Sequence, residues 1–391
     1  MRILHVVPTY LPAVRYGGPI VSVHGLCKAL ARRGHEVHVF TTNVDGPGES
    51  PVSLSAPVDL DGVNVRYYPV PALRRIYWSP RLGKALHRDL AGFDVVHAHS
   101  VFLWPTRAAA QAALNRNVPY VLSPRGMLVQ ELVRRKSKWA KQAWIQVFEA
   151  RNIENASAIH VTSQVEADEL RKFGFVLPAV CVVPNGVDLP GIDEPEGAAA
   201  AEIRDLASQS PYVLFLGRIN WKKGLDRLVE AMALIPDVRL VIAGNDDEGY
   251  RTTIDASSTR AGVAERIAYA GPVYGAEKQL LLQRACAVVV PSYSENFGNV
   301  VLEAMAAGCP VVTTREVGAS SIVLENRAGL VVDGNPGSIA NAISALLSDT
   351  GSAAAMGQRG RKAVADRFNW DAIARSMESV YEDARKRSRL A

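Results

Sequence analysis

Short apolar runs alternate with helix-like segments along most of the chain, and this order restricts the folds that the chain can form. In the first half, strands are predicted at 3–7, 37–41, 63–68, 95–99, 120–123, 159–162 and 180–183. Predicted helices lie at 20–33, 105–114 and 139–154. Because parallel strands need crossover connections and helices provide them, this βαβα order predicts a doubly wound parallel sheet.

The alternation restarts in the second half, after a stretch rich in proline, glycine and acidic residues at 188–197. Strands are expected at or near Tyr212, Val238, Arg266, Ala287, Pro310 and Leu330, and helices at 353–368 and 370–389. We therefore expect two α/β domains, at 1–188 and 189–370, and a last helix at 371–391. The 391 residues, of which 48% are hydrophobic and 21% charged, suffice for two such cores.

Glu295 and Glu303 flank a predicted turn between a strand and a helix. The apolar run 287–291 precedes the turn, and the helix-like stretch 300–307, closed by Gly308, follows it. The residues whose backbone N–H groups would lie at the helix N-terminus are Asn296, Phe297, Gly298 and Asn299. Such groups suit a diphosphate or sugar oxygens, and the two carboxylates suit hydroxyls. The segment therefore predicts a sugar-nucleotide site, and the alternative is a capped helix with two solvated acids.

A second segment places cations at the end of a predicted strand. The apolar run 212–216 leads into Gly217, Arg218, Lys223 and Gly224. Open α/β sheets bind ligands at the carboxyl ends of their strands, and glycines allow the backbone to turn tightly there. Two cations at this place would neutralise a diphosphate and stabilise it as a leaving group. The alternative is a solvated basic loop.

In the first half, Gly17 and Gly18 precede Pro19 and a predicted helix. Their backbone N–H groups could approach a phosphate, whereas the alternative is a plain turn before a helix that starts with proline. No G-x-G-x-x-G fingerprint follows a strand in this half, which argues against a nicotinamide dinucleotide site and so against an oxidoreductase.

Five landmarks in order resemble the retaining glycosyltransferases of family four, which have the GT-B fold. The landmarks are 17–19, 94–99, 184–188, the pair 217–218 with 223–224, and 291–308. The resemblance implies two Rossmann-like doubly wound domains that face an interdomain cleft. It also implies that 1–188 is the acceptor-side domain, that 189–370 binds the nucleotide sugar, and that the helix at 371–391 crosses back to the first domain.

The resemblance also implies roles for individual residues. Glu303 would hold the ribose hydroxyls, Glu295 the hydroxyls of the donor sugar, and Arg218 with Lys223 the diphosphate. The catalytic candidates are His99, Glu295, Arg218 and Lys223. The donor-binding candidates are Gly17, Gly18, Arg218, Lys223, Glu295, Asn296, Phe297, Gly298, Asn299 and Glu303. No residue is an evident nucleophile, so the resemblance implies front-face displacement in which the leaving phosphate helps deprotonate the acceptor.

His97 and His99 lie on one predicted strand, and we expect them to face opposite sides of it, so that only one reaches the site. The family pattern places its functional histidine at the end of this strand, which matches His99 and leaves His97 as a packing residue. Many relatives have a histidine where Arg125 stands. Because arginine cannot act as an acid or base there, we consider an acceptor phosphate or carboxylate as its ligand, or a surface salt bridge.

Basic residues concentrate between 125 and 151, where seven of them stand against two acidic residues in a chain with a formal net charge of +5. The basic residues are Arg125, Arg134, Arg135, Lys136, Lys138, Lys141 and Arg151. Trp139, Trp144, Val147 and Phe148 interleave with them. This segment predicts a surface that contacts an anionic membrane and receives a lipid-linked acceptor, and the alternative is an aromatic core face. No nucleic-acid motif accompanies the charge.

Metal and redox sites are not expected. Asp59 and Asp61 have the Asp-x-Asp spacing of metal-dependent glycosyltransferases of another fold, but Gly62 follows them as in a turn. The acidic run 245–248 is expected to be a solvated loop near the base of the donor. We expect no cofactor and no required metal, because Arg218 and Lys223 can neutralise the leaving diphosphate.

The remaining signals concern the cellular compartment. Cys27, Cys181, Cys286 and Cys309 form no Cys-x-x-Cys pair, which favours reduced thiols. The first apolar run is too short for a signal peptide, and no run of about 18 apolar residues predicts a membrane helix. We expect a cytoplasmic protein, with peripheral contact at the inner face of the membrane as a further hypothesis.

The sequence as a whole predicts a retaining hexosyltransferase. It would move a hexose from a nucleoside-diphosphate sugar to a hydroxyl of a saccharide or glycolipid, in cell-surface polysaccharide or glycoconjugate biosynthesis. Two alternatives stay open: a sugar-nucleotide hydrolase or epimerase of the same fold, and a non-catalytic sugar-nucleotide-binding protein. The base, the sugar, the acceptor and the oligomeric state are not predicted.

Overall fold

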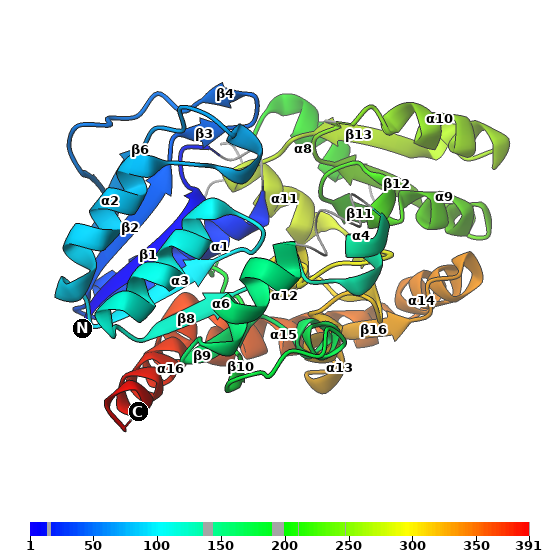
Figure 1. Cartoon of the computed structure of the whole chain (residues 1–391). Coiled ribbons are helices and arrows are strands. Elements are labelled where there is room, and N and C mark those ends of the chain that lie inside the picture. Colours follow the sequence, from blue (N-terminus) through cyan, green and yellow to red (C-terminus); the bar gives the residue numbers. More distant parts are fainter. Residues whose placement is uncertain (14–16, 136–143, 190–198, 210, 247, 391) are drawn as a thin grey trace. The chain divides into compact units, whose positions relative to one another are not determined.

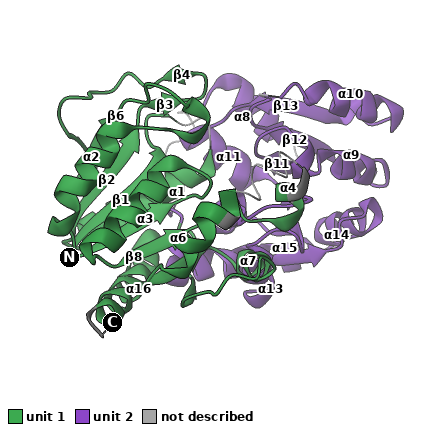
Figure 2. Cartoon of the chain, in the orientation of Figure 1, with its two compact units in different colours: residues 1–186, 370–391 green, residues 187–369 purple. Residues whose placement is uncertain are grey.

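The computed structural model describes residues 1–13, 17–135, 144–189, 199–209, 211–246 and 248–390. These residues form two compact units, one made of residues 1–186 with 370–391 and the other of residues 187–369 (Figure 2). The last helix, α16 (Trp370–Leu390), therefore belongs to the same unit as the N-terminus. The sequence analysis placed the domain boundaries after residues 188 and 370, whereas the two units of the structure meet after residues 186 and 369.

The first unit is built on an eight-stranded sheet with the order β10-β9-β8-β7-β1-β2-β6-β5 (Figure 1). The strands are β1 (Arg2–Thr9), β2 (Glu36–Thr42), β5 (Val58–Leu60), β6 (Val63–Tyr68), β7 (Val95–His99), β8 (Tyr120–Ser123), β9 (Ala158–Val161) and β10 (Val180–Val182). All neighbours pair in parallel except β5 and β6, and a separate antiparallel ribbon joins β3 (Val44–Asp45) and β4 (Gly48–Glu49). Central strands are buried on both faces, which explains their continuous apolar runs.

Helices cover this sheet at positions that the sequence predicted only in part. The helices of the first unit are α1 (Gly18–Arg32), α2 (Pro80–Asp89), α3 (Trp104–Arg116), α4 (Gln130–Arg135), α6 (Ala150–Glu154), α7 (Gln164–Arg171) and α16. Helices α2, α4 and α7 were not predicted. Of these, α7 has a clear start signal, since the Ser163 hydroxyl accepts a hydrogen bond from the Glu166 N–H. Of the helix predicted at 139–154, residues 139–143 lie outside the described part, and a π-helical turn at Ile145–Glu149 precedes α6.

The second unit is built on a six-stranded parallel sheet with the order β13-β12-β11-β14-β15-β16. The strands are β11 (Tyr212–Leu216), β12 (Arg239–Ala243), β13 (Ile267–Gly271), β14 (Ala287–Val290), β15 (Val311–Thr314) and β16 (Gly329–Val332). The helices are α8 (Ala201–Ser208), α9 (Leu225–Ala233), α10 (Arg251–Arg260), α11 (Gly275–Arg284), α12 (Asn299–Ala307), α13 (Ser320–Glu325), α14 (Pro336–Ser348) and α15 (Thr350–Ala363). The prediction of two doubly wound sheets is confirmed, and both sheets are parallel except for the edge strand β5.

Each sheet reverses its strand order once near its middle. In the first unit β1 lies between β2 and β7, and in the second unit β11 lies between β12 and β14. At such a switch point the connections leave to opposite faces, so the carboxyl ends of the strands are open to ligands. The residues that follow β7, β11 and β14 are therefore placed where an α/β protein binds its substrates.

Helix α16 packs closely against α1 within the first unit. Ile373, Met377 and Tyr381 are buried in the same cluster as residues of α1 and of the sheet face beneath them. The indole of Trp370 lies directly against Gly25 of α1, where a Cβ atom would stand 2.3 Å from the Trp370 Cε2 atom. Only glycine at position 25 leaves room for this ring.

We expect Gly25→Ala to lower the stability of the first unit by about 1–3 kcal/mol, because the added methyl group would overpack the site and displace Trp370. Gly337→Ala is the matched control: Gly337 also lies in a helix, and its Cβ would meet only Asn335 Oδ1 at 3.5 Å. The control should be neutral or slightly stabilising. Thermal unfolding of both variants measures the difference, and equal midpoints would contradict the proposed contact.

Candidate functional site

The carboxyl ends of β11 and β14 approach each other so closely that Gly224 is required between them. Gly224 follows the short 3₁₀ helix at Trp221–Lys223 and has a φ of 68°. A Cβ atom on it would lie 2.1 Å from the carbonyl oxygen of Pro291, just after β14. Glycine at this position therefore brings Lys223 beside the loop that follows β14.

Lys223 and Glu295, which sequence analysis assigned to different parts of a donor, contact each other directly. The Lys223 ammonium donates to Glu295 Oε2, and each side chain is 22% exposed. The backbone N–H of Glu295 donates to the Glu316 carbonyl, 3.1 Å away, and the Glu295 carbonyl accepts from Gly318 N–H at 3.0 Å. The loop therefore holds the carboxylate in place beside a cation, and both remain reachable from solvent.

Glu303 also has a basic partner, which the sequence analysis missed. Lys278 of α11 donates to Glu303 Oε1 of α12 across 3.1 Å. The two side chains are 33% and 24% exposed, respectively. No sequence pattern links the two residues, because the contact depends on how α11 packs against α12.

Helix α12 begins and ends as the sequence predicted, within one residue. It spans Asn299–Ala307, with Gly298 before it at a φ of 88° and Gly308 after it at a φ of 78°. Phe297 is buried in the core of the second unit, and its carbonyl accepts a hydrogen bond from Ala319 N–H at 2.8 Å. The turn is thus fixed by a buried ring and places the first turn of α12 beside Glu295.

Arg218 lies two residues after the end of β11 and its side chain is exposed. Within the part of the chain that the structure describes, no hydrogen bond or ion pair reaches its guanidinium group. Its charge is therefore available at the switch point of the second sheet, five residues before Lys223 in the sequence.

A hollow of about 580 Å³ opens at the carboxyl ends of β11, β12 and β13, and its lining does not include Lys223, Glu295 or Glu303. Ile219, Asn245, Arg251 and Tyr269 contribute to its walls. Asp246 caps α10 by accepting from the N–H groups of Tyr250 and Arg251, at 2.8 and 3.2 Å. Of the acidic run at 245–248, Asp247 lies outside the described residues.

In the first unit, Gly17 and Gly18 form the start of α1. Gly17 has a φ of 73°, and a Cβ atom on it would meet no other atom within 4 Å. The Ser22 hydroxyl donates to the Gly18 carbonyl at 2.8 Å, which ties down the first turn. The glycine at 17 is therefore needed for its backbone conformation rather than for close packing.

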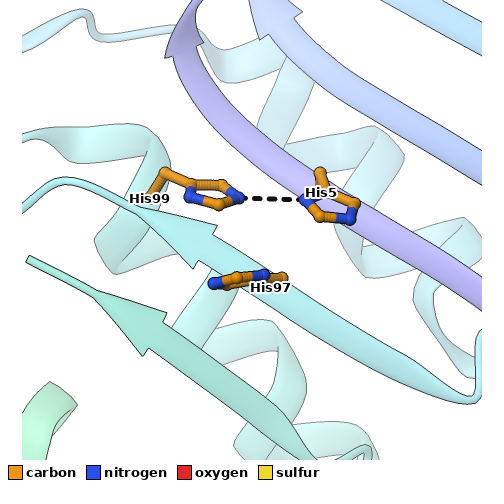
Figure 3. Close-up of side chains that lie close together, drawn as sticks. All are labelled: His5, His97 and His99. Carbon is orange, nitrogen blue, oxygen red and sulfur yellow. Dashed lines mark hydrogen bonds between the residues drawn. The ribbon is translucent and has the colours of Figure 1, made fainter. Parts of the chain in front are cut away.

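The expectation that His97 and His99 face opposite sides of their strand is wrong. Residues two apart on a strand share a face. The two rings lie with their centroids 4.1 Å apart, and His5 of the neighbouring β1 lies on the same side (Figure 3). This is the face that α1 and α16 cover, and all three side chains are buried.

Arg125 contacts this histidine group instead of forming a surface salt bridge. Its Nε atom lies 3.3 Å from His99 Nδ1, and its Nη1 atom donates to Asn185 Oδ1 at 3.3 Å. Burial lowers the pKa of Arg125, and the charge of Glu166 acts in the opposite direction. Both contacts are to neutral acceptors, so the structure brings a half-buried cation beside His99.

Burial keeps the histidines neutral. It lowers the pKa of His5 to about 3, with a further effect from Arg125, and lowers that of His160 to about 3 in the same way. The pKa values of His97 and His99 are also well below the ordinary value, chiefly because of burial. The first unit therefore contains a row of uncharged imidazoles beside one guanidinium group.

The three histidines in Figure 3 offer nitrogen atoms within 4.8 Å of one another, the spacing of a metal site. The hydrogen bonds argue against a cation there. His97 uses both nitrogens, Nδ1 with the Tyr381 hydroxyl at 2.7 Å and Nε2 with the Ser123 hydroxyl at 2.9 Å. The positive charge of Arg125 would also repel a metal ion.

The Asp-x-Asp pair is part of a turn, as expected. Asp59 Oδ1 accepts from Gly62 N–H at 3.1 Å, in the tight connection between β5 and β6. Asp61 instead pairs with His24 and Lys28 of α1, at 2.9 and 3.2 Å. Both carboxylates therefore make contacts that stabilise the fold, one within the turn and the other with α1.

Comparisons with known proteins give one result for both halves of the chain. Residues 199–363 match the family model described as glycosyl transferases group 1, and residues 16–190 match the model described as glycosyltransferase family 4. A D-inositol 3-phosphate glycosyltransferase of Xylanimonas cellulosilytica is 32% identical over 95% of this chain and 93% of its own. The chain belongs to glycosyltransferase family 4. An uncharacterised glycosyltransferase of Methanocaldococcus jannaschii is 28% identical over 98% of both chains.

Solved structures show the same GT-B fold in other glycosyltransferases. Sucrose-phosphate synthase from Thermosynechococcus elongatus superposes with a TM-score of 0.75, at 24% identity and 98% coverage of both chains. HepE of Anabaena, solved in complex with UDP and glucose, has a TM-score of 0.75 at 20% identity, over 98% of this chain and 99% of HepE. This protein is therefore a glycosyltransferase with two Rossmann-like domains.

The neutral histidines predict how the stability of this glycosyltransferase changes with pH. In the unfolded chain an imidazole titrates near 6.5, whereas folded His160 titrates near 3. As the pH falls below 6.5, the unfolded chain binds protons that the folded unit does not, so the stability of the unit falls and recovers as the pH rises. Each such histidine adds up to about 1.4 kcal/mol per pH unit to the slope.

We expect His160→Asn to reduce this slope between about pH 6 and pH 4.5 by up to one such increment. Denaturant unfolding at several pH values measures it, with the variant compared with the unmodified chain at each pH. An unchanged slope would show that folded His160 is not held neutral.

Proposed function

We propose that this glycosyltransferase moves a hexose from a nucleoside-diphosphate sugar to a hydroxyl of a saccharide or glycolipid, with retention of the anomeric configuration. The observation that carries the proposal is the pair of cation–carboxylate contacts, Lys223 with Glu295 and Lys278 with Glu303, on either side of the α12 N-terminus. A nucleotide sugar has both anionic phosphates and polyol groups. Such a ligand can take the cations and the carboxylates as separate partners.

The chemistry of each group suggests a division of the donor within the second unit. Arg218 and Lys223 would neutralise the diphosphate and stabilise its charge as it leaves. Glu295 would then accept hydrogen bonds from hydroxyls of the transferred sugar, with the backbone of Phe297, Gly298 and Asn299 beside it. Glu303 would accept from the ribose, and the hollow lined by Ile219 and Tyr269 has the size for a nucleoside.

Retention is proposed from the likeness to family four, and among the described residues no side chain beside the sugar pocket is an evident nucleophile for a double displacement, which leaves displacement on one face. In the second unit Glu295 is paired with Lys223 and would bind hydroxyls, so the departing phosphate would take the proton of the attacking hydroxyl on the same face. No metal is needed in this scheme, because Arg218 and Lys223 supply the positive charge. His99 would line the reacting face, and Arg125 would bind a phosphate or carboxylate on the acceptor.

A hydrolase or epimerase of the same fold would turn over the donor without an acceptor, and a binding protein would not turn it over at all. The family names of the relatives favour transfer. We propose a role in cell-surface polysaccharide or glycoconjugate biosynthesis, in the cytoplasm.

Binding of the bare nucleoside diphosphate and of the intact nucleotide sugar should separate the two carboxylates. Glu303→Gln should weaken binding of both ligands, because its proposed partner is the ribose that they share. Glu295→Gln should leave the bare nucleotide close to unchanged and weaken the nucleotide sugar, by about 1–3 kcal/mol for the loss of charged hydrogen bonds. Isothermal titration calorimetry with both ligands measures these effects.

Glu325→Gln is the matched control for these variants, because Glu325 is an exposed acid at the end of α13 in the same unit. It should bind both ligands as the unmodified chain does. Equal losses for Glu295→Gln and Glu303→Gln with the bare nucleotide would contradict the division of the donor, and no binding of any nucleotide to the unmodified chain would contradict the proposed function.

The basic segment at 125–151 is proposed to contact an anionic membrane surface. Lys136, Trp139 and the other residues at 136–143 lie outside the described part. The described aromatic rings make contacts within the protein: Trp144 donates to Glu149 at 2.9 Å, and Arg107 stacks on Phe148 at 3.7 Å. Among the described residues no helix is long and apolar enough to cross a bilayer. The proposal thus depends on charge rather than on these rings.

Replacing Arg134, Arg135, Lys136 and Lys138 together by Gln should release the protein from anionic vesicles, since each cation near such a surface adds about 1 kcal/mol. Binding of the unmodified chain should weaken at high salt, because the attraction is screened over about 10 Å. Sedimentation with anionic and neutral vesicles measures both. If the unmodified chain fails to bind anionic vesicles at low salt, the membrane hypothesis is wrong.

A further inference from the structure

The hydrogen bonds around His99 allow only one arrangement of its proton. Both Arg125 atoms that approach His99 Nδ1, Nε at 3.3 Å and Nη2 at 3.2 Å, belong to a group that donates and cannot accept. The Nδ1 atom must therefore present its lone pair. Because buried His99 is neutral, its single proton lies on Nε2, and this N–H donates to His5 Nδ1 at 3.0 Å (Figure 3).

The hydrogen bond from His99 also determines the tautomer of His5. Its Nδ1 atom accepts from His99, so its own proton lies on Nε2, which is buried and has no partner among the described residues. A buried N–H without a partner destabilises a fold by about 1–3 kcal/mol. A leucine at position 5 would fill this apolar face without that cost. Histidine therefore lowers the stability of the unit here, and what it provides instead is the hydrogen bond to His99.

A second chain of hydrogen bonds passes behind His99 without touching its nitrogens. His160 Nε2 lies 2.9 Å from the Val183 carbonyl, so it donates, and its Nδ1 accepts from the Ser123 hydroxyl at 2.7 Å. Ser123 in turn accepts from His97 Nε2 at 2.9 Å, and the Tyr381 hydroxyl donates to His97 Nδ1 at 2.7 Å. This chain holds the His97 ring against the ring of His99.

We propose that Arg125 and His5 are positioning residues that hold His99 as the neutral Nε2–H tautomer, so that His99 offers only the Nδ1 lone pair at the carboxyl end of β7. His99 can then accept a hydrogen bond from a ligand hydroxyl that takes the place of Arg125, and it has no proton to donate there. The identity of that hydroxyl as part of a sugar depends on the proposed function. The tautomer itself depends only on the structure of the first unit.

The lone pair on His99 Nδ1 affects which substrates can bind there. A site that accepts a hydrogen bond favours a free hydroxyl over a deoxy or methoxy group at the same position, because neither can donate. If His99 were instead a general acid, its Nδ1 would have to carry a proton, and two donors, His99 and Arg125, would then face each other at 3.2–3.3 Å.

The tautomer can be observed directly by NMR of protein labelled with ¹⁵N at histidine. Two-bond ¹H–¹⁵N correlations distinguish the Nε2–H, Nδ1–H and doubly protonated rings, and the spectrum of His99→Gln identifies the His99 signals. We expect His99 to show the Nε2–H pattern at neutral pH, without added metal or ligand. An Nδ1–H or doubly protonated His99 would overturn the inference, whatever the activity of the protein.

Variants at position 5 test the positioning role. His5→Asn keeps an acceptor near the place of Nδ1, whereas His5→Leu removes it at similar volume. We expect the Nε2–H pattern to persist in His5→Asn and to weaken or mix with Nδ1–H in His5→Leu. The matched control is His160→Asn. It alters an equally buried histidine that belongs to the second series of hydrogen bonds and does not contact the His99 nitrogens, so it should leave the His99 pattern unchanged.

If the protein transfers sugar as proposed, His5→Leu should lower kcat by about tenfold or more and His5→Asn should recover most of it. Equal loss in both variants, with an unchanged His99 pattern, would make His5 a packing residue and overturn its positioning role. A clear Nε2–H pattern in a protein without transferase activity would instead refute the proposed function and leave the tautomer assignment standing.

Discussion

The reversal of strand order beside β1 and beside β11 is the constraint on which both groups of candidate residues depend. At these points the crossover helices leave to opposite faces, and the carboxyl ends of β7, β11 and β14 are left uncovered. Arg218, Lys223 and Glu295 follow such ends in one unit, and His99 closes such a strand in the other. The chemistry is thus located by topology before any side chain is considered.

Desolvation decides what the side chains at these places can do. In the second unit the side chains of Lys223, Glu295 and Glu303 are 22–24% exposed, so a ligand can reach them and replace their present partners. In the first unit burial lowers the pKa values of His5, His97, His99 and His160 and so keeps these four side chains neutral. One set of residues suits a charged, hydroxyl-rich ligand, and the other suits a single directed hydrogen bond.

Much of this could be predicted from the sequence because the signals were local. Strands buried on both faces give continuous apolar runs, and glycines at both ends of α12 mark its limits. The pair of Lys278 with Glu303 could not be predicted, since it depends on how two helices pack. The shared face of His97 and His99 could have been predicted, because the period of two places alternate residues together; the error was in applying that period.

The cluster of His5, His97 and His99 could not be predicted from any one segment of the sequence, because it depends on which strands are neighbours. His5 pairs in register with His97, and His99 with Ser123, so four polar side chains from three adjacent strands meet on one face. Each alone looks like an isolated polar residue in a strand. Their network appears only when the strand order β8-β7-β1 is known, because β1 and β7 are far apart in the sequence.

The most direct test of the account is the anomeric configuration of the product. A panel of α-linked uridine, guanosine and adenosine diphosphate sugars would be incubated with saccharide and lipid-linked acceptors, and the new glycosidic bond would be observed by proton NMR at early times. The account predicts an α-linked product from one of these donors, with the nucleoside diphosphate released only as transfer proceeds. A β-linked product, or release of the diphosphate at the same rate without an acceptor, would contradict it.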